Sequence, residues 1–309
     1  MSRRPRERGW PADPEPLPAP VVDNHTHLES VLGFDVPDEP ARTLDDHLAR
    51  AASVGVTRLV QVGCDLDAAA WTDTLLRERA AAGDTSLLGA VAVHPNEAVL
   101  HAGVREVAPD GLEPSPEARH DVDLAAAMSR IADLARGNPR IRAIGETGLD
   151  HFRAGPQGRA VQVEAFRSHV ALAKELGLAL QIHDRDAHQE VLDVLRRDGA
   201  PERTVFHCFS GDAEMARTCA EQGWFLSFAG PVTFGANAGL REALHAVPLG
   251  HVLVETDAPY LTPHPYRGRP NAPYLLPHTV RRVADELDRD VAEVCASLAA
   301  TSEAVYGPW

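Results

Sequence analysis

The sequence predicts an α/β protein with the (β/α)8 (TIM) barrel fold. Eight short apolar runs rich in β-branched residues recur along the chain, and amphipathic helical patterns lie between most of them. Most of the runs are continuous rather than alternating, as expected for strands covered on both faces. The chain of 309 residues has the length of one large barrel, and the strand–helix repeat favours this over two average domains.

A doubly wound open sheet is the competing fold. It would place a glycine-rich phosphate-binding turn after the first strand, where this chain instead has His25, Thr26 and His27. The expected strands occupy 21–28, 58–63, 86–94, 141–148, 178–183, 204–210, 224–229 and 252–257.

Glycine follows most of the helical patterns, as is usual at helix C-termini. Thr43 and Asp46 resemble a capping box at the start of the first helix, and Gly55 lies just past its end. The expected helices occupy 44–54, 68–82, 124–136, 157–176, 187–197, 212–222, 239–246, 274–287 and 291–306. The last two close the chain after the eighth strand.

Two segments lie outside this repeat. Residues 1–20 carry several arginines and then prolines, without an apolar signal-peptide core, so we expect a disordered N-terminal tail before a single domain at 21–309. Residues 101–123 exceed a typical loop in an α/β unit and contain Pro109, Pro114 and Pro116, so we expect a surface insertion.

Composition limits the classes of function. The formal net charge is −15, which argues against a protein that wraps duplex nucleic acid through a broad basic face. An enzyme that engages an end of the nucleic acid through bound cations stays compatible with this charge. The four cysteines are scattered, which favours a reducing cytoplasm. No apolar run reaches about 18 residues, so no membrane span is expected.

Imidazole and carboxylate side chains stand where the expected strands end. In a barrel these positions meet at the C-terminal rim, where catalytic groups gather. Any one of them alone would more often be structural, but their common placement favours a site. The residues are His25, His27, His94, Glu146, His183, His207 and Asp257.

The donor types suit two divalent ions. We expect His25, His27 and Asp257 to hold the first, and His183 and His207 to hold the second. Glu146 has two oxygens with which to bridge them. Imidazole and carboxylate sets suit Zn, Mn, Fe or Ni, while Mg prefers more oxygen ligands. Two such ions about 4 Å apart can activate a water and clamp a phosphoryl group, so phosphate esters, amides or lactones are possible substrates.

Six motifs in this order resemble the TatD family of metal-dependent deoxyribonucleases in the amidohydrolase superfamily. They are DNHTHL from Asp23, HP at His94, GETGLD from Gly145, QIHDRDA from Gln181, HCFSG from His207 and ETDAPYL from Glu255. The resemblance spans about Val21 to Tyr306 and implies a barrel that cleaves DNA, often from the 3′ end.

The resemblance implies six metal ligands and a substrate histidine. The ligands are His25, His27, Glu146, His183, His207 and Asp257, holding two divalent ions (Mg, Mn or Zn), and the histidine that meets substrate phosphate is His94. Arg267 and Arg269, in the PYRGRPNAP segment, match a basic loop that could meet a phosphate. The implied substrate is DNA, single-stranded or at 3′ ends. No membrane association and no obligate protein partner is indicated.

As a mechanistic hypothesis, Asp257 takes or orients the proton of the attacking water, while Glu146 holds the ions and His94 stabilises charge on the phosphoryl oxygens. Asp150 could orient a ligand histidine, but an ion pair with Arg153 is the favoured interpretation. The other histidines are interpreted as surface residues: His47, His101, His120, His169, His188, His245, His251, His264 and His278.

Two alternatives stay open. The first is hydrolysis of an amide, a lactone or a D-aminoacyl-tRNA ester by the same metal site. The second is a catalytically silent barrel that binds metal or nucleic acid, although no expected ligand is missing from the chain.

Overall fold

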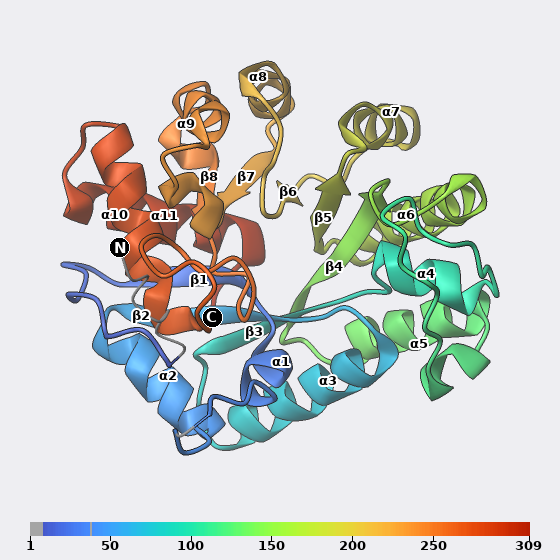
Figure 1. Ribbon diagram of the computed structural model, residues 1–309, viewed down its shortest axis with the longest axis horizontal. Helices are drawn as coiled ribbons and strands as arrows, with labels where there is room; N and C mark the ends of the chain where they lie inside the picture. Colours follow the sequence, from blue (N-terminus) through green and yellow to red (C-terminus); the bar gives the residue numbers. More distant parts are fainter. Residues whose placement is uncertain (1–8, 38) are drawn as a thin grey trace, which may run out of the picture.

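The computed structural model describes residues 9–37 and 39–309, and it is a (β/α)8 barrel. Eight parallel strands form one sheet in sequential order. Figure 1 shows the strands at the centre and the helices around them. The strands are β1 (Val21–Thr26), β2 (Val56–Gly63), β3 (Leu87–Val91), β4 (Ile141–Asp150), β5 (Ala179–Arg185), β6 (Thr204–Phe206), β7 (Phe225–Phe228) and β8 (Val252–Val254).

Each expected helix is present within a few residues of its predicted bounds, and two further helices, α1 and α4, follow β1 and β3. The helices are α1 (Leu28–Leu32), α2 (Leu44–Ser53), α3 (Leu66–Ala81), α4 (Pro95–His101), α5 (Leu124–Gly137), α6 (Pro156–Leu176), α7 (His188–Asp198), α8 (Ala213–Glu221), α9 (Ala238–His245), α10 (Leu276–Glu286) and α11 (Val291–Tyr306). Short 3-10 turns are η1 (Ala118–Asp121), η2 (Gly230–Thr233), η3 (Leu249–His251) and η4 (Pro273–Leu275).

Local sequence explains the helix ends. Thr43 and Asp46 form the expected capping box of α2, with reciprocal side-chain and backbone hydrogen bonds. Helix α6 ends at Gly177, whose φ of 61° lies in the left-handed region that glycine adopts without strain. Pro95 occupies the first turn of α4, where its missing N–H costs no hydrogen bond.

Apolar side chains fill two regions. The larger cluster lies between the strands and the surrounding helices. The smaller cluster joins residues of strands that face one another across the barrel, such as β2 and β6, with Tyr306 of α11. It therefore fills the barrel interior. Small residues such as Ala143 and Ala179 belong to this interior cluster. The helices lack the length and apolar character of a membrane span wherever the chain is described.

The barrel closes at a seam between β1 and the residues that follow β8. Thr26 forms a parallel bridge with Ala258. The Asn24 amide donates to the carbonyl of Val254 at 2.9 Å, and the N–H of Asp257 donates to the carbonyl of His25 at 2.9 Å. The first and last strands therefore meet through residues that lie beside the expected metal ligands.

The N-terminal segment differs from the expected tail. Residues 1–8 lie outside the described residues, but 9–20 pack against the barrel. Trp10 and Leu17 are each 8% exposed, and the Tyr274 hydroxyl donates to the carbonyl of Pro11 at 2.8 Å. Proline enrichment here marks an extended segment lying on the protein surface, so disorder was the wrong expectation for 9–20.

Candidate metal centre

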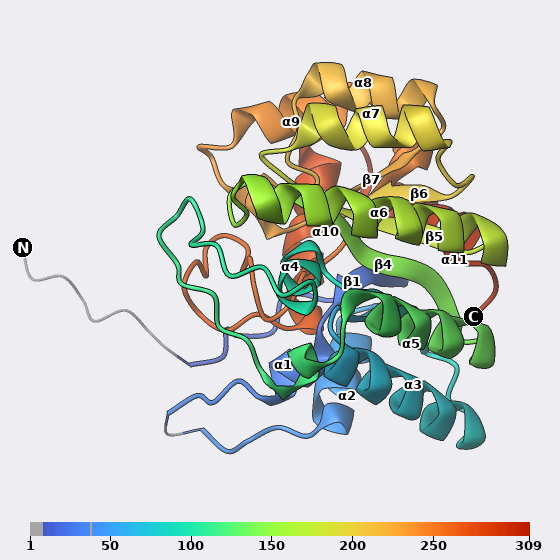
Figure 2. The same cartoon turned by 90° about the vertical axis from the view of Figure 1, so that its right-hand side faces the viewer.

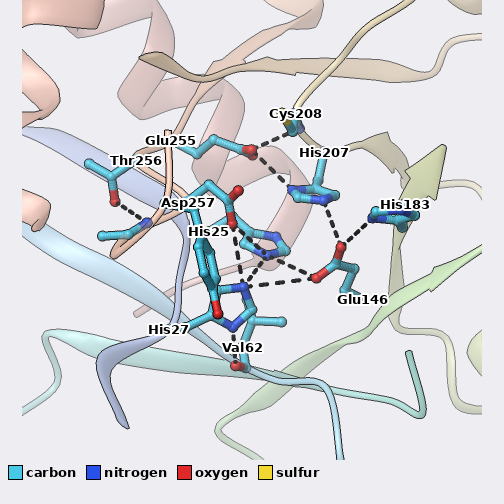
Figure 3. Close-up of polar contacts among 12 residues, drawn as sticks. His25, His27, Val62, Glu146, His183, His207, Cys208, Glu255, Thr256 and Asp257 are labelled. Atoms are coloured by element: carbon cyan, nitrogen blue, oxygen red, sulfur yellow. Dashed lines mark hydrogen bonds and ion pairs between the residues drawn. The ribbon is translucent and has the colours of Figure 1, made fainter. Parts of the chain in front are cut away.

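All six expected ligands meet at the C-terminal end of the barrel. His25 is the fifth residue of β1, and His27 caps the short helix that follows it. Glu146 and His183 lie within β4 and β5, while His207 directly follows β6. Asp257 follows β8 by three residues. Figure 3 shows these side chains pointing toward one another from their separate strands.

The two oxygens of Glu146 face two different pairs of histidines. Oε1 lies 2.6 Å from Nδ1 of His183 and 2.9 Å from Nε2 of His207. Oε2 lies 3.6 Å from Nε2 of His25 and 3.9 Å from Nε2 of His27. The Glu146 carboxylate therefore lies between the two pairs of imidazoles, with one oxygen directed at each pair.

The donor atoms of the first pair converge on one point. Nε2 of His25 and Nε2 of His27 are 3.3 Å apart, and Oδ1 of Asp257 lies 3.4 Å from Nε2 of His27. Nδ1 of His27 donates to the carbonyl of Val62 at 3.0 Å, which leaves the lone pair on Nε2. Two imidazole nitrogens and a carboxylate directed at one point fit a divalent cation.

Asp257 is carried over the site by an unusual backbone turn. Its φ of 52° lies in the left-handed region, which non-glycine residues seldom adopt. Strand β8 ends at Val254, three residues before the end that the sequence predicts. The Asp257 side chain is 12% exposed, compared with 7% for Glu146, so Asp257 lies closer to the entrance.

Glu255 is a functional residue that the sequence analysis missed. It is fully buried. Its Oε1 accepts a hydrogen bond from Nδ1 of His207 at 3.1 Å and one from the N–H of Cys208 at 2.7 Å. Because Nδ1 of His207 carries the proton, its Nε2 presents a lone pair to the centre of the site.

Asp150 has a similar role for His183. Nε2 of His183 lies 3.3 Å from Oδ2 of Asp150, and the amide of Asn96 donates to the same oxygen at 3.0 Å. The Arg153 guanidinium instead pairs with Asp110 at 3.3 Å. The predicted ion pair between Asp150 and the Arg153 side chain is therefore wrong, and only the Arg153 backbone N–H reaches Asp150.

The buried charges suit a cation. Burial alone would raise the pKa of Glu146, but the neighbouring His207 and His94 outweigh it and hold the pKa well below its usual range. Burial opposes charge on His183 as well, yet Asp150 and Glu146 raise its pKa to about 9. The carboxylates create a negative potential that favours protonated imidazoles. The same potential favours a divalent ion in place of those protons.

His94 lies in the same site. It caps α4, where its Nδ1 accepts the N–H of Asn96 at 3.1 Å. Its other nitrogen, Nε2, therefore carries the proton and lies 3.5 Å from Oε1 of Glu146. This N–H faces the centre of the site, where it can donate to an oxygen of a bound anion.

Sequence comparison decides the family. A family model described as TatD related DNase matches residues 22–307. The chain belongs to the TatD family. A TatD-family relative from Mycobacterium tuberculosis, named an uncharacterized metal-dependent hydrolase, is 42% identical over 291 residues, covering 93% of this chain and 98% of the relative. The Bacillus subtilis relative YabD, also named an uncharacterized metal-dependent hydrolase, is 31% identical and covers 89% and 94%.

A third TatD relative carries a more specific name. The Erwinia amylovora protein called 3'-5' ssDNA/RNA exonuclease TatD is 34% identical over 204 residues, covering 64% of this chain and 76% of the relative. Among solved structures, the TatD homologue YJJV of Escherichia coli superposes with a TM-score of 0.75 at 22% identity, covering 94% and 98%. That likeness supports the barrel fold. The protein is thus a metal-dependent hydrolase of the TatD family.

The two arginines of the loop after β8 have different surroundings. Arg269 donates from Nε to the carbonyl of Gly9 at 2.9 Å and from Nη2 to that of Trp10 at 2.8 Å. It therefore anchors the N-terminal segment, and a contact of Arg269 with phosphate stays a prediction. Arg267 is exposed, and its guanidinium lies 5.6 Å from the ring centre of Phe234.

Four of the histidines interpreted as surface residues are buried, so that interpretation is wrong for them: His47, His101, His120 and His169. Some of their partners lie far away in the sequence, such as Val122 for His101 and Glu97 for His120, and leave no local pattern. His188 is partly exposed and its Nδ1 lies 2.8 Å from Oδ2 of Asp184. His245 and His264 are exposed, as expected.

A second group of potential ligands lies at the base of the 101–123 insertion. Ligand atoms of Glu97, His101 and His120 lie within 4.8 Å of one another. However, Nδ1 of His120 accepts the N–H of Glu117 at 2.7 Å, so neutral His120 keeps its proton on Nε2, which donates to Glu97 at 2.9 Å. Arg119 also donates to Glu97 at 2.7 Å. Glu97, Arg119 and His120 form a hydrogen-bonded clamp that holds the insertion to α4, while the buried Nε2 of His101 has no hydrogen-bond partner among the described residues.

Proposed function

We propose that this protein hydrolyses phosphodiester bonds at the 3′ ends of single-stranded DNA, using two divalent cations. The observation that carries the proposal is the placement of Glu146 between two separate imidazole pairs, with Asp257 beside one of them. The name of the Erwinia amylovora relative supports a nucleic-acid end as the substrate.

The ligand set fits Mg, Mn or Zn, and we propose the last two as the better match to imidazole-rich donors. His25, His27 and Asp257 would hold one ion, His183 and His207 the other, and Glu146 both. When bound, the ions would supply Lewis-acid stabilisation of the phosphoryl group and lower the pKa of a water.

The chain's own residues complete the reaction. Asp257, near the entrance, accepts the proton of the attacking water. His94 donates its Nε2–H to a non-bridging phosphoryl oxygen and so stabilises the charge that develops there. Asp150 and Glu255 keep His183 and His207 in the tautomers that face the ions.

The burial of the ligands favours a flexible substrate. The liganding side chains are only 0–17% exposed, so the scissile phosphate must reach side chains that are largely covered by the protein. The net charge of −15 gives no broad surface for duplex binding. A single strand or a frayed 3′ end can bring a phosphate to these side chains more easily than a stiff duplex can.

Asp257→Asn and Glu146→Gln test the proposal directly. With a 5′-labelled single-stranded oligonucleotide and excess Mn or Mg, we expect each to lower kcat by about 10²–10⁴-fold, the usual contribution of a positioned acid or base. Asp193→Asn removes an exposed carboxylate that pairs with Arg196 and should keep wild-type turnover.

Chelation of the wild type should stop cleavage, and re-addition of metal should restore it. Wild-type turnover by either site variant would refute the mechanism. Multiple turnover of a lactone or a D-aminoacyl-tRNA without cleavage of DNA would replace the proposed substrate, and the absence of multiple turnover on every substrate would indicate a non-catalytic barrel.

A further inference from the structure

We infer that Tyr260 is a stacking platform for an unpaired base of the substrate, an inference that rests on the proposed function. Tyr260 lies three residues beyond Asp257 and is 56% exposed. Its ring meets the ring of His27 edge to face, with centroids 6.0 Å apart. An exposed aromatic ring thus directly contacts a histidine of the metal centre.

The loop that carries Tyr260 is fixed by buried hydrogen bonds. The N–H of Tyr260 donates to the carbonyl of Asp257 at 2.8 Å. The fully buried amide of Asn271 donates to the carbonyl of Thr256 at 2.9 Å and also to that of Tyr260. The backbone that carries the ring is therefore held in place before any ligand binds, which lowers the entropy lost on binding.

Stacking suits the charge of this protein. A chain with a net charge of −15 gains little affinity from phosphates beyond those at the ions. Aromatic–base stacking needs no positive charge, tolerates every base and contributes about 1–3 kcal/mol per base. An exposed ring beside the metal centre supplies this affinity within reach of the nucleotide whose phosphate is cleaved.

Phe152, at the end of β4, is less suited to this role. It is 36% exposed, and the guanidinium of Arg185 lies over its ring at 3.9 Å from the centroid. One face of that ring is already occupied by an intramolecular cation–π contact. Tyr260 is also the ring that touches a site histidine, so we assign the base to Tyr260.

The assignment has a consequence for substrate form. A base in the interior of a duplex has both faces covered by its neighbours and cannot stack on Tyr260. The platform therefore favours strand ends and unpaired bases over duplex interiors, and it does so without reading sequence. This agrees with the burial of the ligands.

The test compares two single-stranded oligonucleotides of the same length. The base-bearing strand has bases on its 3′-terminal nucleotides, and the abasic strand lacks the bases at those positions. For Tyr260→Leu we expect KM for the base-bearing strand to rise about 5- to 150-fold, the equivalent of 1–3 kcal/mol, with kcat nearly unchanged. KM for the abasic strand should not change. Tyr260→Phe keeps the ring and should behave as the wild type.

Phe34→Leu is the matched control. Phe34 is 44% exposed but contacts Trp10, at 6.2 Å between ring centroids, rather than a site histidine. It should leave both KM values unchanged. The inference is overturned if Tyr260→Leu changes KM for the two strands equally, or for neither.

A binding measurement separates this inference from the proposed function. If the wild type cleaves neither strand, the proposed function fails. Fluorescence anisotropy then gives Kd for both strands directly. A wild-type preference for the base-bearing strand that disappears in Tyr260→Leu supports the platform, and the same Kd values in wild type and variant overturn it.

Discussion

Acid should destabilise this protein through His169, a histidine of α6 that is buried in its neutral form. His169 has no exposed surface. Its Nδ1 donates to the carbonyl of Ala165 at 2.8 Å, and its Nε2 accepts the N–H of Val93 at 3.2 Å. A second proton on Nε2 would face that N–H donor. Burial lowers the pKa of His169 from 6.5 to about 4.

The direction of the pH effect follows from the lowered pKa. Above pH 6.5 both the folded and the unfolded chain keep His169 neutral, and its full contribution to stability is present. As the pH falls from 6.5 toward 4, the unfolded chain takes up a proton that the folded chain does not, and stability is lost. At a pH of about 4.5 this loss amounts to about 2.5 kcal/mol, from 1.36 kcal/mol per pKa unit.

The assay is urea unfolding of metal-free protein at pH 7 and pH 4.5. Other groups titrate too, so the wild type is compared with His169→Gln, whose amide stays neutral. The informative quantity is the difference between the two proteins in the free energy of unfolding lost from pH 7 to pH 4.5. The wild type should lose about 2.5 kcal/mol more than the variant. His264→Gln, at an exposed position, should lose as much as the wild type.

Equal losses in wild type and His169→Gln would refute this reasoning. Should that variant fail to fold, NMR titration of the His169 ring in the wild type gives the same answer. A pKa near 6.5 would show that burial does not hold this ring neutral.

Two further substitutions test the residues that support the site and the insertion. Glu255→Gln should weaken Mn or Zn binding about 10- to 100-fold in calorimetry, because it removes the charge that orients His207. Glu293→Gln is the control and should leave Kd unchanged, because the Glu293 carboxylate pairs with Arg289 on the surface. An unchanged Kd in Glu255→Gln would contradict the role of Glu255. Glu97→Ala removes the hydrogen-bond acceptor of Arg119 and His120 and should lower the free energy of unfolding by about 1–3 kcal/mol. It should also speed limited proteolysis within 101–123. An unaltered rate of proteolysis would mean that the clamp does not hold the insertion.

The sequence predicts the barrel because its evidence is local. Strands such as β3 and β8 appear as uninterrupted apolar runs, and the chain separates such runs by helical patterns. Helix α4 was missed although Pro95 and Glu97 mark a helix start. The predicted end of β8, at Asp257, lies three residues too late. Asp257 adopts a left-handed backbone conformation that no propensity scale indicates.

The site was predicted only as far as residue type and strand position allow. The six ligands lie in the C-terminal halves of their strands or just after them, so topology alone brings them together. Glu255 was passed over even though a carboxylate directly after the apolar run of β8 is itself a signal of a buried, paired charge. Of the two partners of His169, Ala165 lies one helical turn earlier on α6, but Val93 could not be anticipated, because that contact spans 76 positions of sequence.

The seam between β1 and the residues after β8 links the chemistry to the order of synthesis. One group of potential ligands combines His25 of the first strand with Asp257, which follows the last strand. An ion bound by both residues would link the two ends of the sheet, like a clasp. A growing chain displays its N-terminal histidines long before Asp257 leaves the ribosome. Incomplete or truncated copies therefore lack this clasp, and the enzyme becomes competent only after nearly its whole length has been made.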